Sequence, residues 1–148
     1  GVEFRNPELG DADLAALTPL KHVNRLDLRH SRVGAAGLGA WADRRGLQEL
    51  ALDYTSISDA ELAALADMTG LETLSLEGLD ATAKGIRHLE GLVNLRELNL
   101  SRRLAGTEIA EVLAKLPSLR RLNVKHCGWN REAAAQLEQK MSTLLVEY

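Results

Sequence analysis

The sequence predicts an α/β solenoid, in which short parallel strands form the concave face of a horseshoe arc and short helices form the convex face. Two observations lead to this fold class. An apolar pattern, seen as Leu71-Glu-Thr-Leu74-Ser-Leu76, recurs at a constant step of 24 residues. Each copy is followed by a segment whose apolar residues have the spacing of a short amphipathic helix. Units of this kind stack side by side and share one elongated core.

The strand pattern can be followed along the whole chain without an insertion or a deletion. Its further copies are Val23/Leu26/Leu28, Leu47/Leu50/Leu52, Leu95/Leu98/Leu100 and Leu119/Leu122/Val124. A clipped copy at Val2/Phe4 opens the chain, and Thr143/Val146/Tyr148 closes it. Residues 1–148 are therefore predicted to form a single domain of about six 24-residue repeats.

The helix starts are marked by capping residues. The first helical segment runs from Leu9 to Leu20, and its buried stripe is predicted to hold Leu9, Leu14, Leu17 and Leu20. In a later unit, Ser58-Asp-Ala-Glu61 has the form of a capping box, in which Ser58 accepts from the Glu61 amide and Glu61 reaches back. The same position is held elsewhere by Thr82 and Asn130, and in the remaining units by Gly10, Gly34 and Gly106.

These repeats resemble the leucine-rich repeat family. The unit Thr55-Ser-Ile57-Ser-Asp-Ala-Glu-Leu62 resembles its helix-backed, cysteine-containing class, in the shorter version common in bacterial proteins. The resemblance implies that a turn slot after each strand bonds the turn backbone. This slot holds Ser31, Thr55, Leu79, Arg103 and Cys127. Leu79 and Arg103 depart from the family pattern, and an irregular turn is expected at 103–107. Trp41 and Trp129 are expected to pack in the core.

Composition excludes several classes of protein. The formal net charge of -3 gives no bulk attraction to nucleic acid or to anionic membranes. No apolar run is long enough to cross a bilayer, and no signal segment opens the chain. The single cysteine, Cys127, allows no internal disulfide and no thiol metal cluster, and is expected to be a buried structural thiol. We therefore expect a cytoplasmic protein without a cofactor or a metal.

The residues between the strand leucines are expected to line the concave face, because side chains alternate along a strand. The candidate binding residues are Arg25, Asp27, Arg29, Glu49, Asp53, Tyr54, Glu77, Arg102, Arg121, Lys125 and His126. The middle strands are acidic and the fifth is basic, a banding that predicts a partner with the opposite order of charges. The alternative is that mixed charges provide only solubility and edge protection. Tyr54 is the one aromatic residue at these positions and the candidate contact anchor.

Two functions follow from these expectations. The first is a protein-recognition module that binds a polypeptide on the concave face. The second is a sensor, targeting or autoinhibitory arm of a larger enzyme or signalling protein, since neither end of the chain has the polar capping unit that solenoids need. The ends then belong to a larger protein or are covered by a partner. An enzyme is not expected: His30 and His126 lie about 19 Å apart across four strand steps, and a His30–Asp53 pair has no nucleophile beside it.

Overall fold

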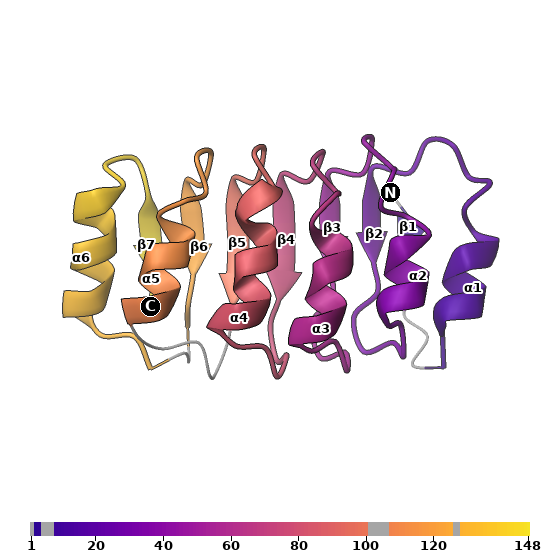
Figure 1. Ribbon diagram of the computed structural model, residues 1–148, viewed down its shortest axis with the longest axis horizontal. Helices are drawn as coiled ribbons and strands as arrows, with labels where there is room; N and C mark the ends of the chain where they lie inside the picture. The colour runs from indigo at the N-terminus through magenta and orange to yellow at the C-terminus, as the bar shows by residue number, and fades with distance from the viewer. Residues whose placement is uncertain (1, 4–7, 101–106, 126–127) are drawn as a thin grey trace.

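The chain folds into two layers, a parallel β-sheet and a row of short helices (Figure 1). The computed structural model describes residues 2–3, 8–100, 107–125 and 128–148. Within them the strands run in sequence order: β1 (Val2–Glu3), β2 (Arg25–Asp27), β3 (Glu49–Ala51), β4 (Thr73–Leu76), β5 (Glu97–Leu100), β6 (Arg121–Asn123) and β7 (Leu145–Glu147). The helices are α1 (Asp11–Ala16), α2 (Ala35–Gly39), α3 (Asp59–Leu62), α4 (Ala83–Ile86), α5 (Thr107–Leu113) and α6 (Arg131–Lys140), and the 3-10 turns η1 (Ala63–Leu65) and η2 (Arg87–Gly91) continue α3 and α4.

The sheet keeps the register of the sequence repeat. Each described strand pairs with the next at an offset of 24 residues, as in Leu26 with Leu50 and Leu50 with Leu74. The row continues through Leu98 and Leu122, and every one of these leucines is at most 2% exposed. The predicted solenoid and its uninterrupted repeat are therefore confirmed. The core is a row of equivalent leucine layers between the two faces.

The first helix is shorter than predicted. Leu14 is fully buried, but Leu20, which was expected in the same stripe, is 45% exposed. The residue 24 positions later is Arg44, a charged residue, whose guanidinium donates to the Leu20 carbonyl at 2.6 Å. Trp41 is buried as predicted, and its indole Nε1 donates to the Leu14 carbonyl at 3.0 Å.

The turn slot after the strands is filled in more than one way. Thr55 bonds the turn as expected, with its hydroxyl donating to the Leu52 carbonyl at 2.7 Å. Ser31 does not: its buried hydroxyl has no hydrogen-bond partner among the described residues. Leu79 is 5% exposed and packs into the core instead. Arg103, Cys127 and the irregular turn expected at 103–107 lie outside the described residues, apart from residue 107, where α5 begins.

The helix starts are joined in pairs by aspartates. Asp11 accepts from the Gly34 amide at 2.6 Å, which ties α1 to the start of α2. Asp59 accepts from both the amide and the hydroxyl of Thr82 at 2.6 Å, which ties α3 to the start of α4. We call these two contacts the aspartate junctions. Position 35, at the start of α2, holds alanine, so the α2–α3 boundary has no such carboxylate.

Each aspartate junction also contains a glycine. A Cβ at Gly37 would lie 2.6 Å from Oδ1 of Asp11, and a Cβ at Gly85 would lie 2.4 Å from Oδ1 of Asp59. The equivalent positions of the other two units hold Asp13 and Glu61, which bond the cap residues of their own helices instead. Helix starts of the first four units therefore alternate between two types, with the same type returning after two repeats.

The predicted capping box at α3 is present. The Glu61 carboxylate accepts from the Ser58 amide at 2.9 Å and also from the Ser58 hydroxyl. These hydrogen bonds lower the pKa of Glu61, because they stabilise its charged form. Thr82 and Asn130 also cap as predicted, accepting from the amides of Lys84 and Ala133.

The last helix contacts the last strand through a polar bond. In α6, the carboxylate of Glu138 accepts from the Val146 amide of β7 at 3.1 Å. The neighbouring Leu145 amide instead donates to Arg120, on the β6 side. Glu138 therefore satisfies a backbone donor on the other edge of β7. None of the described helices is long and apolar enough to cross a membrane.

Candidate functional site

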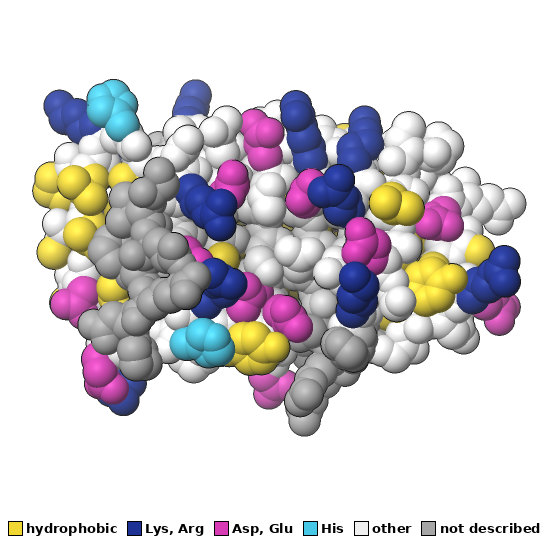
Figure 2. Space-filling view, turned by 180° about the vertical axis from the view of Figure 1, so that it is seen from behind, with side chains coloured by type: hydrophobic (Ala, Val, Ile, Leu, Met, Phe, Trp, Pro, Cys, Tyr) yellow, Lys and Arg dark blue, Asp and Glu magenta, His cyan; other side chains and the backbone are white. Residues whose placement is uncertain are grey.

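The candidate site is the surface of the sheet that faces away from the helices, which Figure 2 shows. We call it the sheet face. It is formed by the strand residues that alternate with the buried leucines, because successive side chains point to opposite sides of a strand. Its described members are Arg25, Asp27, Arg29, Glu49, Ala51, Asp53, Thr73, Ser75, Glu77, Glu97, Asn99, Arg121, Asn123, Lys125, Leu145 and Glu147. Positive and negative side chains lie next to one another across it (Figure 2).

Three ion pairs join exposed charges of neighbouring units among the described residues of the sheet face. Arg25 lies 3.2 Å from Glu49, and Arg121 forms an ion pair with Glu97. Lys125 lies 3.0 Å from Glu147. The repeat register brings these partners together, since adjacent strands are about 4.8 Å apart. Among the described residues, the basic band is therefore neutralised at Arg121 and Lys125, whereas in the acidic band only Glu49 has such an ion pair. Exposed pairs of this kind contribute little stability each.

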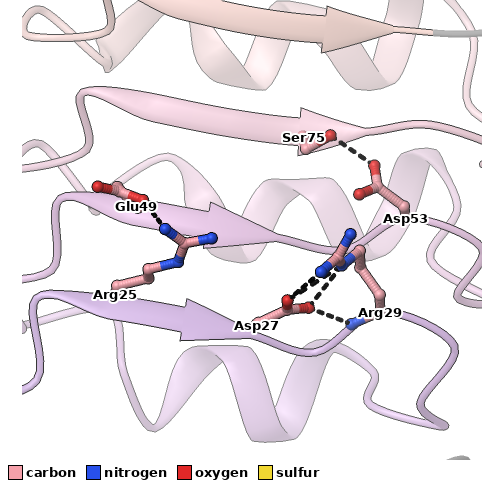
Figure 3. Close-up of polar contacts among 6 residues, drawn as sticks. All are labelled: Arg25, Asp27, Arg29, Glu49, Asp53 and Ser75. Atoms are coloured by element: carbon pink, nitrogen blue, oxygen red, sulfur yellow. Dashed lines mark hydrogen bonds and ion pairs between the residues drawn. The ribbon is translucent and has the colours of Figure 1, made fainter. Parts of the chain in front are cut away.

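Two of the candidate binding residues are buried. Asp27 is 2% exposed and Asp53 is 6% exposed, although both were predicted as surface charges. The Arg29 guanidinium covers Asp27, donating from Nε to Oδ1 at 2.8 Å and from Nη2 to Oδ2 at 2.5 Å (Figure 3). Oδ1 of Asp53 accepts from the Ser75 hydroxyl and from the Glu77 amide, both at 2.6 Å. Strand alternation placed these residues correctly, but Arg29 covers Asp27 from the same segment, and the next strand and its turn bond Asp53.

A hollow of about 200 Å³ lies over β2, β3 and β4 on the sheet face. Its lining includes the small side chains of Ala51, Thr73 and Ser75. The surrounding positions hold longer residues, Arg25 and Arg29 toward β2 and Asn99 on β5. The hollow therefore exists because two neighbouring units carry short side chains between units with long ones. The sequence carries a signal for this hollow, the small residues Ala51, Thr73 and Ser75 at neighbouring sheet-face positions.

Beyond the carboxyl ends of β2 and β3, two rings are stacked. The rings of His30 and Tyr54 lie 5.0 Å apart and within 3° of parallel. Both residues have left-handed backbones, with φ values of 61° and 56°. Tyr54 is 54% exposed, and its hydroxyl donates to Glu77 at 3.3 Å. Its ring also lies against Gly78, where a Cβ would come within 2.4 Å of Tyr54 Cδ1. The candidate anchor is thus exposed but held in place.

The histidines and Arg102 were the remaining candidates from the sequence. His30 contacts Asp53 through its backbone, with its amide donating to the Asp53 carbonyl at 2.9 Å, while its ring stacks on Tyr54. Arg102 and His126 lie outside the described residues. In the described part of the chain, no group of three or more His, Cys, Asp or Glu side chains is placed to hold a metal ion. The site is therefore a polar surface with one hollow and one ring stack at its edge.

Comparison with solved structures identifies the fold class of this surface. Internalin C2 from Listeria monocytogenes superposes with a TM-score of 0.63 and 24% identity, over 89% of this chain and 54% of that one. Internalin F from the same organism superposes with a TM-score of 0.58 and 20% identity, over 91% of this chain and 44% of that one. The chain spans about half the length of these proteins. This likeness shows the leucine-rich repeat fold and, at such identities, the fold alone.

The sequence matches no known family profile and no curated protein. The function must therefore be argued from the surface of this chain.

Proposed function

We propose that the chain is a protein-recognition module and that a polypeptide partner binds across its sheet face. The hollow over β2, β3 and β4 carries this proposal, because it is a concave, polar feature on the layer that the helices leave uncovered. Solenoids offer such extended surfaces to their partners. Tyr54 follows Asp53, a lining residue of the hollow, in the chain, and its exposed ring is held in place by the stack on His30.

The charge pairing favours a polypeptide over a nucleic acid as the ligand of the sheet face. Arg25 and Arg121 are each engaged by a carboxylate of a neighbouring strand. With these cations neutralised and a net charge of -3, a nucleic-acid backbone is a poor ligand for the sheet face. A polypeptide can exchange such half-exposed pairs for its own and gain specificity from their order.

A second candidate is a recognition arm of a larger protein that senses, targets or inhibits. The coverage of only 54% and 44% of the two internalins favours it, because both of those chains extend beyond the part that superposes. We also assign the chain to the helix-backed class of the fold, since short helices lie behind the sheet in the successive units. Both assignments leave the sheet face as the surface that meets the partner.

The proposal can be tested without a known partner by selecting binders from a displayed peptide library on the purified chain. Two matched variants of one repeat then map the binding surface. Ala51→Trp fills the hollow on the sheet face, and Ala60→Trp adds the same side chain to the exposed side of α3. We expect most selected peptides to lose at least about tenfold in affinity with Ala51→Trp, while Ala60→Trp leaves binding within about twofold. The opposite ranking would move the recognition surface to the helices.

A further inference from the structure

We infer that the hollow on the sheet face receives a cationic side chain, an alkylammonium or guanidinium group, from the partner polypeptide. This inference rests on the proposed function and names the chemistry of the residue that enters the hollow. It is argued from the size of the hollow, from the balance of charge around it and from the partners of one buried carboxylate.

The size of the hollow fits one long side chain. Its volume is about 200 Å³, whereas a water molecule has a share of about 30 Å³ in the liquid. The hollow is open to the sheet face, with Ala51 and Ser75 among the small residues below it. An extended lysine or arginine side chain can therefore enter without displacing a strand.

Among the described residues that line the hollow, acidic side chains outnumber basic ones. Its acidic lining residues are Asp27, Glu49 and Asp53, and its basic ones are Arg25 and Arg29. Arg29 is bound to Asp27, and Arg25 is bound to Glu49. In the described part of the chain, the lining carboxylate that has no cation is that of Asp53.

Asp53 is stabilised only by neutral donors. Oδ1 accepts from the Ser75 hydroxyl and the Glu77 amide, while the described residues provide no ion pair to this carboxylate. In Figure 3 its second oxygen points away from Ser75, back over the sheet toward the side where Arg29 lies. The side chain is 6% exposed, so water solvates it poorly. A buried carboxylate with hydrogen bonds but no counter-charge attracts a cation strongly.

An anionic side chain fits the hollow less well. Both arginines in its lining are already occupied, and the Arg29 guanidinium is held by three hydrogen bonds to Asp27 from its side chain. An incoming carboxylate would have to break one of these pairs and would also meet Asp53. The Arg25–Glu49 pair is more exposed, with 60% and 47% of the two side chains accessible, and can move aside for a long side chain.

The inference can be tested with small probes that need no partner. The probes are the N-acetyl methylamides of lysine, arginine and norleucine, titrated into the ¹⁵N-labelled chain and followed by NMR. The reporter is the Glu77 amide, which donates to Asp53. The matched control is the Lys125 amide, which donates at 3.0 Å to the neutral Asn123 side chain on the same face. We expect saturable shifts at Glu77 with lysine and arginine, little change with norleucine, and little change at Lys125.

A charge-removing variant assigns the effect to one carboxylate. Asp53→Asn keeps the size and the acceptor for Glu77, and should weaken lysine and arginine probes about tenfold. Glu49→Gln, at the exposed rim, should change their affinity by less than about threefold. Equal shifts with norleucine, or full binding by folded Asp53→Asn, would overturn the inference. The comparison of lysine with norleucine in the unmodified chain keeps the test valid if the variant fails to fold.

This experiment separates the inference from the proposed function. If selected peptides respond to Ala51→Trp but the cationic probes give no saturable shift at Glu77, the sheet face binds a partner without a basic anchor, and only the inference fails. If the peptides respond to Ala60→Trp instead, the proposed function fails, whatever the probes do.

Discussion

The sheet side and the helix side of this solenoid follow different periods. On the sheet side, the same leucine positions return every 24 residues, as in Leu50, Leu74 and Leu98. On the helix side, aspartate-and-glycine junctions join α1 to α2 and α3 to α4, and the equivalent residues Asp11 and Asp59 are 48 positions apart. At the α2–α3 boundary the equivalent residue of α2 is Ala35, which has no carboxylate, so no such junction forms there.

The difference shows which interactions are shared by all units and which belong to pairs. A leucine layer needs only a similar layer on each side, so every interior unit can use the same residue. An aspartate junction needs a carboxylate in one unit and an open space in the next, which Gly37 and Gly85 provide. A unit that gives the carboxylate and a unit that makes room for it therefore differ in sequence. The four predictions below test this contrast.

The largest effect is expected in the shared layers. Leu74→Ala and Leu50→Ala should each lower the free energy of unfolding by roughly 2–5 kcal/mol, through lost burial and a residual cavity. Because both leucines are buried in equivalent layers, the two losses should agree within about 1 kcal/mol. Urea denaturation with an unchanged m-value measures them. A clear disagreement would mean that the sheet side is not built of equivalent units.

A smaller effect is expected when the space in a junction is filled. In Gly85→Ala the new Cβ would meet Oδ1 of Asp59 at 2.4 Å and its Cα at 2.9 Å. We expect a loss of about 1–3 kcal/mol. Gly39→Ala is the control in α2, where a Cβ meets nothing within 4 Å, and it should gain about 0.5–1 kcal/mol. Thermal unfolding of both variants gives the comparison, and a stabilised Gly85→Ala would refute the close junction.

Removing the carboxylate of a junction should lower the free energy of unfolding by less than filling its space does. Asp59→Ala loses the acceptor for the Thr82 amide and hydroxyl, and should destabilise by about 1 kcal/mol. Asp67→Ala, an exposed aspartate of the same unit, should stay within about 0.5 kcal/mol of the unmodified chain. In the double variant with Gly85→Ala, the two losses should not add, because the clash with Asp59 Oδ1 is relieved. Additive losses would show that the two residues are independent.

The smallest effect is a pH dependence located at these helix starts. Burial raises the pKa of Asp59, but hydrogen bonds from Thr82 outweigh it and hold that pKa below 3.8. Hydrogen bonds from Ser58 hold the pKa of Glu61 below 4.5. Because both pKa values are lower in the folded chain, the stabilisation is complete above the unfolded values and is lost as the pH falls through the folded ones. Between pH 6 and about 3, the free energy of unfolding should therefore fall less with falling pH in Asp59→Asn and Glu61→Gln than in the unmodified chain.

Part of the candidate site could be predicted from strand alternation. Alternation placed Arg25, Glu49 and Arg121 on the sheet face, since it follows from backbone geometry alone. It did not predict that Asp27 and Asp53 are covered, because their burial depends on groups 2 to 24 positions away. The Arg29 side chain bonds Asp27, whereas the Ser75 hydroxyl and the Glu77 amide bond Asp53. Nor did it predict the stack of His30 on Tyr54, which requires left-handed backbones at both residues.

The sequence by itself determined the period, the strand register and the buried leucines. A 24-residue repeat leaves only one way to align identical layers, and a shift of one residue would turn every leucine to the solvent. It also marked the helix starts, as at Ser58 and Thr82, because capping is local. Only the tertiary structure decided which charges are free, where the hollow lies and which helices are joined. Those outcomes depend on distances of a few ångströms between side chains of different units, such as Arg25 with Glu49 and Asp59 with Thr82.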